Sequence, residues 1–156
     1  MIIDYQKLVD MFPDLLLDEI QCLEERTVGW KQIGPGDPFF EDTSANSEVP
    51  NCLVLKALIQ CGKTGVLTIE GLYDSLDPSS VNVSIETARF FHPLKIGDKL
   101  RVEVESRKSE TQEVYQKGKA FVDDNIVAEA SWVAHTKRSG KLGQLRKIFS
   151  RKKLNI

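Results

Sequence analysis

The sequence lacks the features that mark membrane and secreted proteins. None of its apolar runs is long enough to cross a bilayer. The opening residues, MIIDYQKLVD, carry an acid within their apolar stretch and do not form a secretory signal. The cysteines are odd in number and have no C-x-x-C spacing, which argues against a disulfide framework. We therefore expect a reduced protein in the cytoplasm. Each thiol should be buried in the apolar run that contains it: Cys22, Cys52 and Cys61.

Histidine is scarce too, and its positions indicate no catalytic site. The two histidines, His92 and His135, lie in the predicted sheet region, and we interpret both as structural or surface residues. We expect no metal and no cofactor. The remaining composition is ordinary for a globular protein. The chain has 156 residues, of which 41% are hydrophobic and 28% charged, enough for one domain with a substantial core.

Charge is spread unevenly along the chain. Residues 137–156 contain eight of the 21 basic residues and no acid, which leaves 13 basic and 23 acidic residues, a net charge of −10, on residues 1–136. We predict a single domain over 1–136 and a basic tail over 137–156. The tail can form an amphipathic helix on an anionic membrane surface, bind an acidic protein, or remain a disordered solubilising segment. Nucleic acid is not expected, because the chain has no recognition motif for it. Four apolar residues lie among the cations of the tail: Leu142, Leu145, Ile148 and Phe149.

The longest apolar segment begins after Pro50 and is predicted to be a helix. Its run from Cys52 to Ile59 contains one charged residue, Lys56, and is followed by further apolar residues without an early break. This length favours a helix over a buried strand. A proline in the first turn and a glycine at 62 or 65 suit its two ends, so we predict a helix over about 50–64. Because it is apolar nearly all round, it should be buried.

The other segments with a regular pattern are predicted to be mostly strands. Alternation of apolar and polar residues indicates antiparallel strands, and only the first segment has the period of a short helix. One long helix among antiparallel strands predicts an α+β fold, with a sheet wrapped around the helix. The predicted segments are a helix over 4–11, two strands or one long bent ribbon within 15–33, and strands over 81–90, 100–105, 113–122 and 126–135, the last two joined by a tight turn at 123–125.

Four motifs, in this order along the chain, resemble the 3-hydroxyacyl-[acyl carrier protein] dehydratases, which have the hot-dog fold. The resemblance covers about residues 11–136. It implies an antiparallel sheet around one long central helix, and a homodimer whose pocket lies between the subunits. It also implies partners in the form of acyl thioesters, carried by acyl carrier protein or coenzyme A. The motifs are MFPDLLLDEI, the stretch from Phe39-Phe40 to Gln60, ETARFFHPLKIGDKLRVEVE and AFVDDNIVAEASW.

The second motif is where the family has its active site. The catalytic histidine of the family falls on Asp42 or Thr43, because the loop here is one residue shorter, and the carboxylate of the helix falls on Lys56. Backbone N–H groups at the helix start polarise the thioester carbonyl in the family. By resemblance, six residues would line or bind the substrate: Phe39, Phe40, Pro50, Asn51, Cys52 and Gln60.

These departures bear on the chemistry. Dehydration needs a base for the proton beside the carbonyl and an acid for the leaving hydroxyl, and both are replaced here. We therefore expect a protein that binds acyl thioesters without ordinary dehydratase activity. An ammonium inside an apolar helix needs a partner, so we expect Lys56 near the acyl pocket, paired with Asp42 or with Glu41 or Glu48.

Two alternatives remain open from the sequence. Asp42 or Glu48, with Asn46 or Asn51 as a polar partner, could act as base or nucleophile in the hydrolysis of an acyl thioester. The chain could also be a non-catalytic interaction subunit that pairs with another hot-dog protein.

Overall fold

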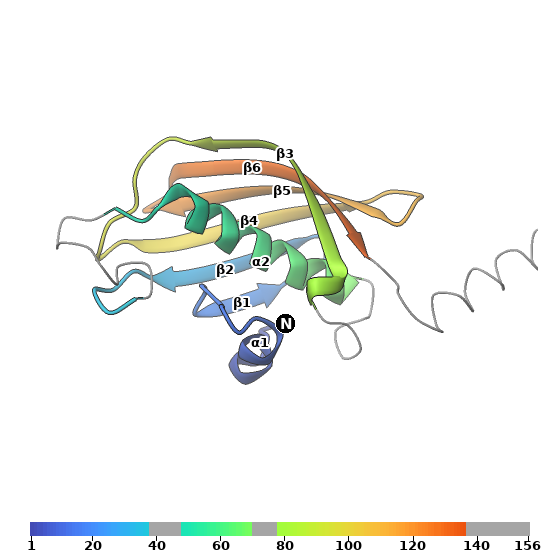
Figure 1. The fold of residues 1–156 in the computed structure, drawn as a ribbon, viewed down its shortest axis with the longest axis horizontal. Coiled ribbons are helices and arrows are strands. Elements are labelled where there is room, and N and C mark those ends of the chain that lie inside the picture. Colours follow the sequence, from blue (N-terminus) through green and yellow to red (C-terminus); the bar gives the residue numbers. More distant parts are fainter. Residues whose placement is uncertain (38–47, 70–77, 137–156) are drawn as a thin grey trace, which may run out of the picture.

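The computed structural model describes residues 1–37, 48–69 and 78–136, apart from the side chains of Ile69 and Ser79 (Figure 1). The basic tail, 137–156, lies outside the described residues. The elements follow in the order α1 (Tyr5–Met11), β1 (Glu19–Cys22), β2 (Arg26–Gln32), α2 (Asn51–Ile69), the 3₁₀ turn η2 (Pro78–Ser80), β3 (Val81–Phe90), β4 (Lys99–Lys108), β5 (Glu113–Val122) and β6 (Asn125–Thr136).

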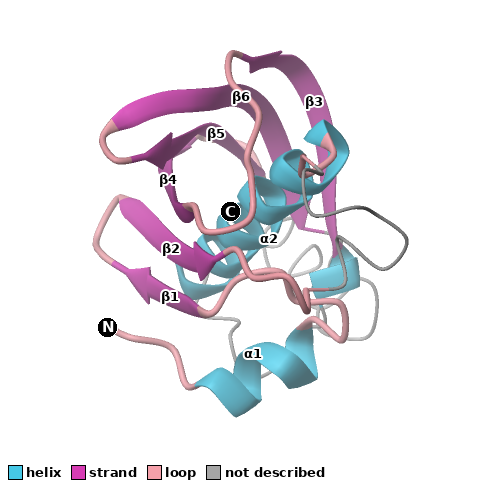
Figure 2. Cartoon of the chain, turned by 90° about the vertical axis from the view of Figure 1, so that its left-hand side faces the viewer, coloured by secondary structure: helices cyan, strands magenta, loops and turns pink. Residues whose placement is uncertain are grey.

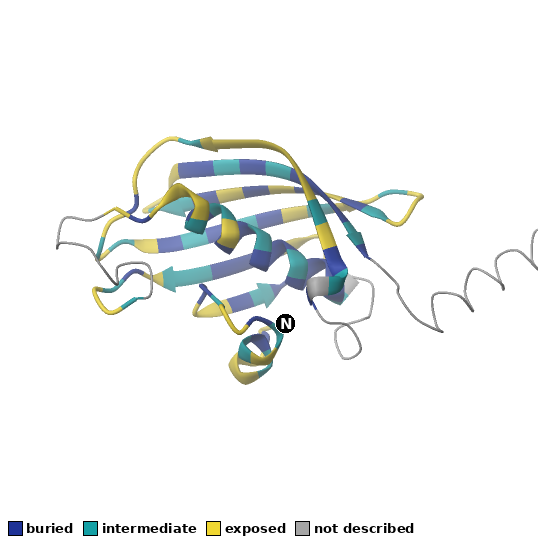
Figure 3. Ribbon diagram, in the orientation of Figure 1, coloured by how far each residue is buried: buried dark blue, intermediate teal, exposed yellow. Residues whose placement is uncertain are grey.

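The strands form one antiparallel sheet that curves around α2. Their spatial order is β1-β2-β4-β5-β6-β3, so that β3, the first strand after the helix, lies at one edge beside β6. Figure 2 shows α2 lying in the hollow of this sheet. Buried and exposed positions alternate along β4 and β5, as a sheet with one covered face requires (Figure 3). The predicted α+β fold is therefore confirmed.

Helix α2 is longer than the sequence pattern predicted. We expected it to end near one of its glycines, but it continues to Ile69. Both glycines lie where the helix approaches other side chains closely. A Cβ atom at Gly62 would lie 2.7 Å from Oε1 of Gln116, and one at Gly65 would lie 2.4 Å from Oγ1 of Thr27. The glycines therefore allow α2 to pack tightly on the sheet, and they do not end it.

A buried polar contact fixes the helix against the middle of the sheet. Nε2 of Gln116, on β5, donates to the carbonyl of Gly62 at 2.9 Å and to Oγ of Ser106 at 2.9 Å. Its Oε1 accepts a hydrogen bond from Nε1 of Trp132 at 2.6 Å. Both N–H donors and the oxygen of this buried amide are thus satisfied, as a polar group in a core must be.

The hairpin between β5 and β6 has a shorter turn than predicted. Val122 and Asn125 still pair across the two strands, which leaves two residues in the turn. Asp123 and Asp124 have φ values of 48° and 66°. Positive φ at both positions matches a type I′ turn, whose twist suits a two-residue hairpin.

The two edges of the sheet differ. The first three residues lie along β1: the N–H of Ile3 donates to the carbonyl of Ile20 at 3.0 Å, and that of Cys22 donates to the carbonyl of Met1 at 2.8 Å. At the opposite edge, β3 has ten residues and pairs with β6 on one side only, among the residues that the structure describes. One edge is therefore covered by the chain itself, and the other has no second neighbour among the strands that the structure describes.

The prediction that all three thiols are buried is wrong for one of them. Cys22 and Cys61 are buried, and burial raises the pKa of the Cys61 thiol well above its ordinary value. Cys52 is exposed, because it lies in the first turn of α2, where Pro50 and Asn51 are exposed as well. Within the described ranges, no helix is both long and apolar enough to span a membrane.

Candidate active site

The structure describes five of the nine residues that the sequence assigns to the site. Phe39, Phe40, Asp42 and Thr43 lie outside the described residues. The other five are brought together on one element, because they occupy the start and the first three turns of α2: Pro50, Asn51, Cys52, Lys56 and Gln60.

Two backbone donors at the start of α2 have no acceptor within the described residues. The N–H groups of Leu53 and Val54 both point to the carbonyl of Pro50, at 2.9 and 3.4 Å. Those of Asn51 and Cys52 donate to no acceptor in the part of the chain that the structure describes. Both residues are exposed, and their N–H groups stand at the positive end of the helix dipole, where a helix start can bind a carbonyl oxygen or an anion.

The segment that leads into α2 is attached to the turn before β4. Val49 is buried, and its N–H donates to the carbonyl of Leu94 at 2.8 Å. Glu48 forms an isolated antiparallel bridge with Lys95. The helix start is therefore held in place by the backbone of another part of the chain.

Lys56 lies on the exposed side of α2 and is paired with Asp14. Its side chain is 43% exposed and its ammonium forms an ion pair with the carboxylate of Asp14, which is 60% exposed. The hydrogen bond from Lys56 is the main reason why the pKa of Asp14 lies below its ordinary value. The sequence analysis did not consider Asp14 as a partner. Of the three partners that it did consider, Asp42 and Glu41 lie outside the described residues.

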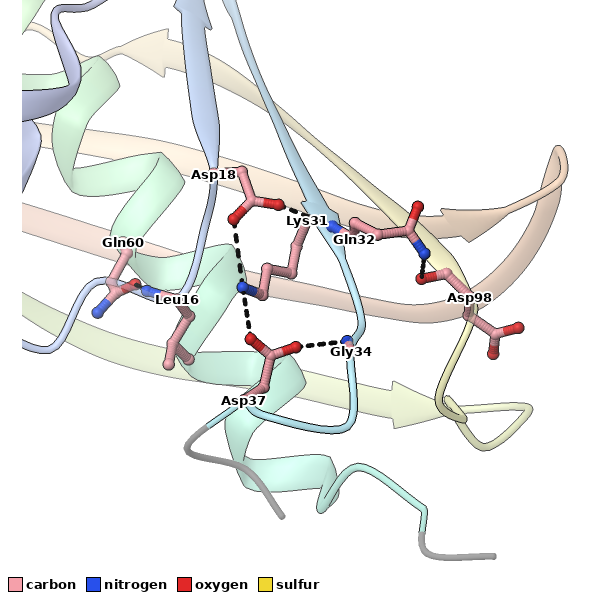
Figure 4. A network of polar contacts seen from close by, with 8 residues as sticks. All are labelled: Leu16, Asp18, Lys31, Gln32, Gly34, Asp37, Gln60 and Asp98. Atoms are coloured by element: carbon pink, nitrogen blue, oxygen red, sulfur yellow. Dashed lines mark hydrogen bonds and ion pairs between the residues drawn. The ribbon is translucent and has the colours of Figure 1, made fainter. Parts of the chain in front are cut away.

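Gln60, one turn after Lys56, binds the same segment of chain. Its side chain is buried. Its Oε1 accepts the N–H of Leu16 at 2.9 Å (Figure 4). Its Nε2 donates to the carbonyl of Asp14 at 3.0 Å. The resemblance assigns Gln60 to substrate binding, whereas in this structure both ends of its amide hold residues 14–16 against α2.

Comparison with known proteins decides the family. Residues 13–131 match the model of the FabA-like domain. The chain belongs to the FabA-like family. The FabZ 3-hydroxyacyl-[acyl-carrier-protein] dehydratase of Campylobacter jejuni is 37% identical over 125 residues, which cover 76% of this chain and 84% of the relative. That of Syntrophotalea carbinolica is 35% identical over 133 residues, which cover 83% of this chain and 89% of the relative.

Solved structures of other proteins share the fold of this FabA-like chain at low identity. A chain of the dehydratase heterocomplex ApeI:P from Xenorhabdus doucetiae has a TM-score of 0.62 at 12% identity, covering 86% of this chain and 90% of that one. An uncharacterised protein of Pyrococcus horikoshii has a TM-score of 0.61 at 15% identity, covering 91% and 99%.

The ion pair joins two segments that the sequence analysis treated separately. The resemblance would place Lys56 at the carboxylate of the family's helix, and that assignment stays a prediction. The structure pairs Lys56 with Asp14, a residue of the opening motif MFPDLLLDEI. The opposite charges of the two residues are visible in the sequence, but their separation along the chain gives no sign that they meet.

A hollow elsewhere on the surface does not resemble a substrate site. It has a volume of about 920 Å³ and lies where β2 begins, β4 ends and β5 begins, away from the start of α2. Its lining includes three acids, Glu24, Glu25 and Glu105, together with four basic residues. Such a mixture of charges favours a solvated surface over selective binding of an acyl group.

Proposed function

We propose that this FabA-like protein binds acyl thioesters, carried by acyl carrier protein or coenzyme A, and lacks ordinary 3-hydroxyacyl dehydratase activity. The observation that carries the proposal is Lys56. It replaces the carboxylate of the helix and is already paired with Asp14. An ammonium is a far weaker acid than a carboxylic acid, and it cannot accept a proton as a carboxylate does, so it is a poor replacement in proton transfer near neutral pH.

The second catalytic position supports the same conclusion. The family's histidine would fall on Asp42 or Thr43, and neither residue has an imidazole side chain. The only histidines of the chain lie on other elements: His135 is on β6, 3.7 Å from a carboxylate oxygen of Glu113, and His92 follows β3. If these assignments hold, neither of the two positions carries the group that the family uses there, so the pair of groups that dehydration uses in the family is missing.

Binding can persist where catalysis is lost. The backbone N–H groups of Asn51 and Cys52 can donate hydrogen bonds to a thioester carbonyl without any special side chain. Other described residues near them, such as Val49 and Leu94, keep the helix start in place through backbone hydrogen bonds. The proposed site therefore retains the part that orients the carbonyl.

We propose further that two copies associate along β3. The open edge of this strand can pair with another strand, and two identical antiparallel edges suit a two-fold axis. Ile85, opposite the buried Trp132, is 51% exposed, and Phe91 is 47% exposed. Leu55 and Ile59 of α2 are only partly buried. Association would cover these apolar side chains and place the partner beside the helix.

The test is an assay of purified protein with 3-hydroxyacyl thioesters of short, medium and long chains. We expect saturable binding, measured by calorimetry, and no elimination of water, measured by the absorbance of the conjugated product. Turnover similar to that of a FabZ dehydratase measured alongside would refute the proposal. Release of free thiol in the same reactions would instead favour the hydrolase that uses loop carboxylates such as Asp42 or Glu48.

A second candidate is a non-catalytic subunit that pairs with another hot-dog protein. The open edge of β3 favours it as much as it favours a homodimer, and one structure of similar fold comes from a dehydratase heterocomplex. Sedimentation of the purified chain separates the two. A stable dimer at micromolar concentration favours self-association, and a monomer favours a different partner.

The basic tail completes the proposal. We propose that residues 137–156 bind an anionic partner, either a membrane surface or acyl carrier protein, in the cytoplasm. Deletion of the tail should leave the melting temperature unchanged and abolish binding to vesicles of anionic lipid or to acyl carrier protein, and added salt should weaken both kinds of binding. A deletion that unfolds the domain would show that the tail is structural.

A further inference from the structure

The face of the sheet that is turned away from α2, here called the outer face, carries charged side chains. A Cβ atom at Gly118, on β5, would lie 2.8 Å from the ring of Trp132 and 3.0 Å from the side chain of Leu58 on α2. Gly118 therefore faces the helix. Because side chains alternate along a strand, Lys117 and Lys119 point to the outer face, and both residues are exposed.

Cross-strand pairing puts two rows of side chains next to each other on the outer face. Each row takes one residue from β5, one from β6 and one from β3, which are neighbours in the sheet. Side chains directly opposite each other on neighbouring strands can interact. The two rows bring together three cations, one carboxylate and two hydroxyl groups. They are Lys117–Ser131–Thr87 and Lys119–Glu129–Arg89.

These six residues surround a hollow, here called the outer hollow. It has a volume of about 380 Å³, and its lining also includes Gly118 and Ala130, which pair with each other between the two rows. Three cations and one acid give the lining a net charge of +2, whereas residues 1–136 as a whole carry −10. The outer hollow therefore attracts an anion, although the domain as a whole repels it.

The two hydroxyl groups of the outer hollow have a hydrogen to spare. Oγ1 of Thr87 and Oγ of Ser131 lie 2.8 Å apart and share one hydrogen bond. Each hydroxyl carries one hydrogen, so the hydroxyl that accepts this bond keeps its own hydrogen for another acceptor. Neither hydroxyl has a second partner in the described part of the chain. The pair can therefore donate to a bound oxygen atom.

The lysines of the outer hollow are not neutralised by ion pairs. Neither Lys117 nor Lys119 forms one with any acid in the described ranges. One acid of β4 stands opposite each lysine, but neither of these acids lines the hollow. The acid that does line it, Glu129, lies 4.0 Å from a guanidinium nitrogen of Arg89. Both ammonium groups are thus available to an anion.

This set of donors suits a phosphate group. A phosphate monoester carries a charge of about −1.5 to −2 near neutral pH, and its three oxygens can accept hydrogen bonds from a hydroxyl and from several cations at once. An alkyl chain or a nucleotide base would need apolar or aromatic lining. Among the described residues, no aromatic or long aliphatic side chain lines the outer hollow.

We propose that the outer hollow is a binding site for a phosphate group, either free in solution or in the headgroup of a lipid. The hydroxyl pair of Thr87 and Ser131 donates to one oxygen, and the cations of the two rows contact the others. The site lies on the face of the sheet opposite α2. It is therefore separate from the proposed acyl-thioester site, and its test does not depend on that proposal.

The test is a titration of the full-length, isotope-labelled protein with inorganic phosphate at constant ionic strength, followed by NMR. We expect the backbone amides of Thr87, Lys117 and Ser131 to shift and saturate together. The double variant Lys117→Gln/Lys119→Gln should weaken binding by about tenfold or more, because it removes two charge-assisted contacts. Glu129→Gln should strengthen binding instead, because it removes the acid of the hollow.

Two further variants separate the site from general charge effects. Lys99→Gln is the matched control, because Lys99 is an exposed lysine on β4 that does not line the outer hollow. It should bind phosphate as wild type does. Ser131→Ala removes a hydroxyl without a change of charge, and we expect it to weaken binding by about threefold or more. Ser131→Ala and Glu129→Gln carry the test if the double lysine variant does not fold.

Vesicles distinguish the two sources of phosphate. If the ligand is a lipid headgroup, vesicles of phosphatidylcholine with phosphatidic acid should bind wild type more tightly than the double lysine variant. If wild type and variant bind these vesicles equally, while inorganic phosphate still distinguishes them, the ligand is a free phosphate.

Three results would overturn the proposal. The first is a set of amide shifts confined to residues 137–156, which would assign phosphate binding to the basic tail. The second is equal binding of phosphate by wild type and by the double lysine variant. The third is an equal response to phosphate and to chloride at the same ionic strength, because this would show screening of surface charge without a site.

Discussion

Two lysines of this chain are held by aspartate, and they differ in how much water surrounds them. Lys31 is 15% exposed and bridges two carboxylates. Lys56 is 43% exposed and has one carboxylate partner, Asp14, which is more exposed still. Water screens the second pair far more than the first. The ion pair of Lys56, the lysine that the family motif suggested, therefore contributes less to stability than that of Lys31. Beside Lys56, the hydrogen bonds of the buried Gln60 amide attach residues 14–16 to α2.

The largest effect should therefore come from the amide. Gln60→Leu leaves the buried N–H of Leu16 and the partly buried carbonyl of Asp14 without their partner. We expect the free energy of unfolding to fall by about 1–3 kcal/mol, measured by urea denaturation. The control is Gln6→Leu, an exposed amide on α1 that binds Asp10. Equal losses in the two variants would contradict this account.

Removal of the shielded ammonium should come next. Lys31→Met leaves the carboxylates of Asp18 and Asp37 close together without the cation between them. We expect a loss of about 1–2 kcal/mol in the free energy of unfolding. Lys99→Met, on the neighbouring strand, should change it by less than about 0.5 kcal/mol. A loss no greater than that of Lys56→Met would remove the distinction between the two lysines.

Removal of the exposed ammonium should have little effect on stability. Lys56→Met is expected to cost about 0.5 kcal/mol or less, because both members of the pair face water. Lys56→Glu should cost more than Lys56→Met, since it places a second carboxylate beside Asp14. Asp14→Asn in the same chain should recover that extra loss, and a double-mutant cycle measures the coupling. Absence of coupling would mean that the pair does not form in solution.

The smallest effects on the free energy of unfolding should appear at the extremes of pH. Titration of Lys31 should lower it at high pH, and titration of Asp14 should lower it at low pH. The folded-state pKa of Lys31 is raised from 10.5, so its stabilisation is complete below that pH and is lost as pH rises through the folded-state pKa. The pKa of Asp14 is lowered from 3.8 by its hydrogen bond with Lys56, so its stabilisation is complete above that pH and is lost as pH falls through the folded-state pKa.

A pair of variants checks these signs. Lys31→Met should flatten the alkaline part of a plot of unfolding free energy against pH and leave the acid part unchanged. Asp14→Asn should do the reverse, and by less, because Asp14 is exposed. If both variants changed the same limb, one of the two assignments would be wrong.

Much of the fold could be predicted from local pattern. Alternation of apolar and polar residues indicated every strand, and the run that follows Pro50 indicated α2. The prediction failed where packing decides the outcome. Gly62 and Gly65 look like helix ends in sequence, but they serve the close approach of α2 to Gln116 and Thr27. Cys52 looks buried within an apolar run, but it lies in an exposed first turn.

The candidate site was less predictable than the fold, because its contacts join distant parts of the chain. Lys56 was predicted as a site residue because it interrupts an apolar run. Its partner, Asp14, could not be predicted in the same way, since it lies far away in the sequence. The shielding of Lys31 was not predicted, because a lysine on an alternating strand looks like a solvated residue. The fold brings Asp18 and Asp37 to the ammonium of Lys31, and only this contact shows that Lys31 is shielded from water.

The glycines of α2 also limit the route of an alkyl chain through this protein. At Gly62 and Gly65 the helix lies so close to β5 and β2 that even one added carbon would collide with side chains of the sheet. At these two positions, therefore, no hydrocarbon tail fits between the layers. If the protein binds acyl thioesters as proposed, the alkyl chain would have to pass α2 elsewhere. Leu55 and Ile59 are partly buried apolar side chains of this helix and are candidates to line that route.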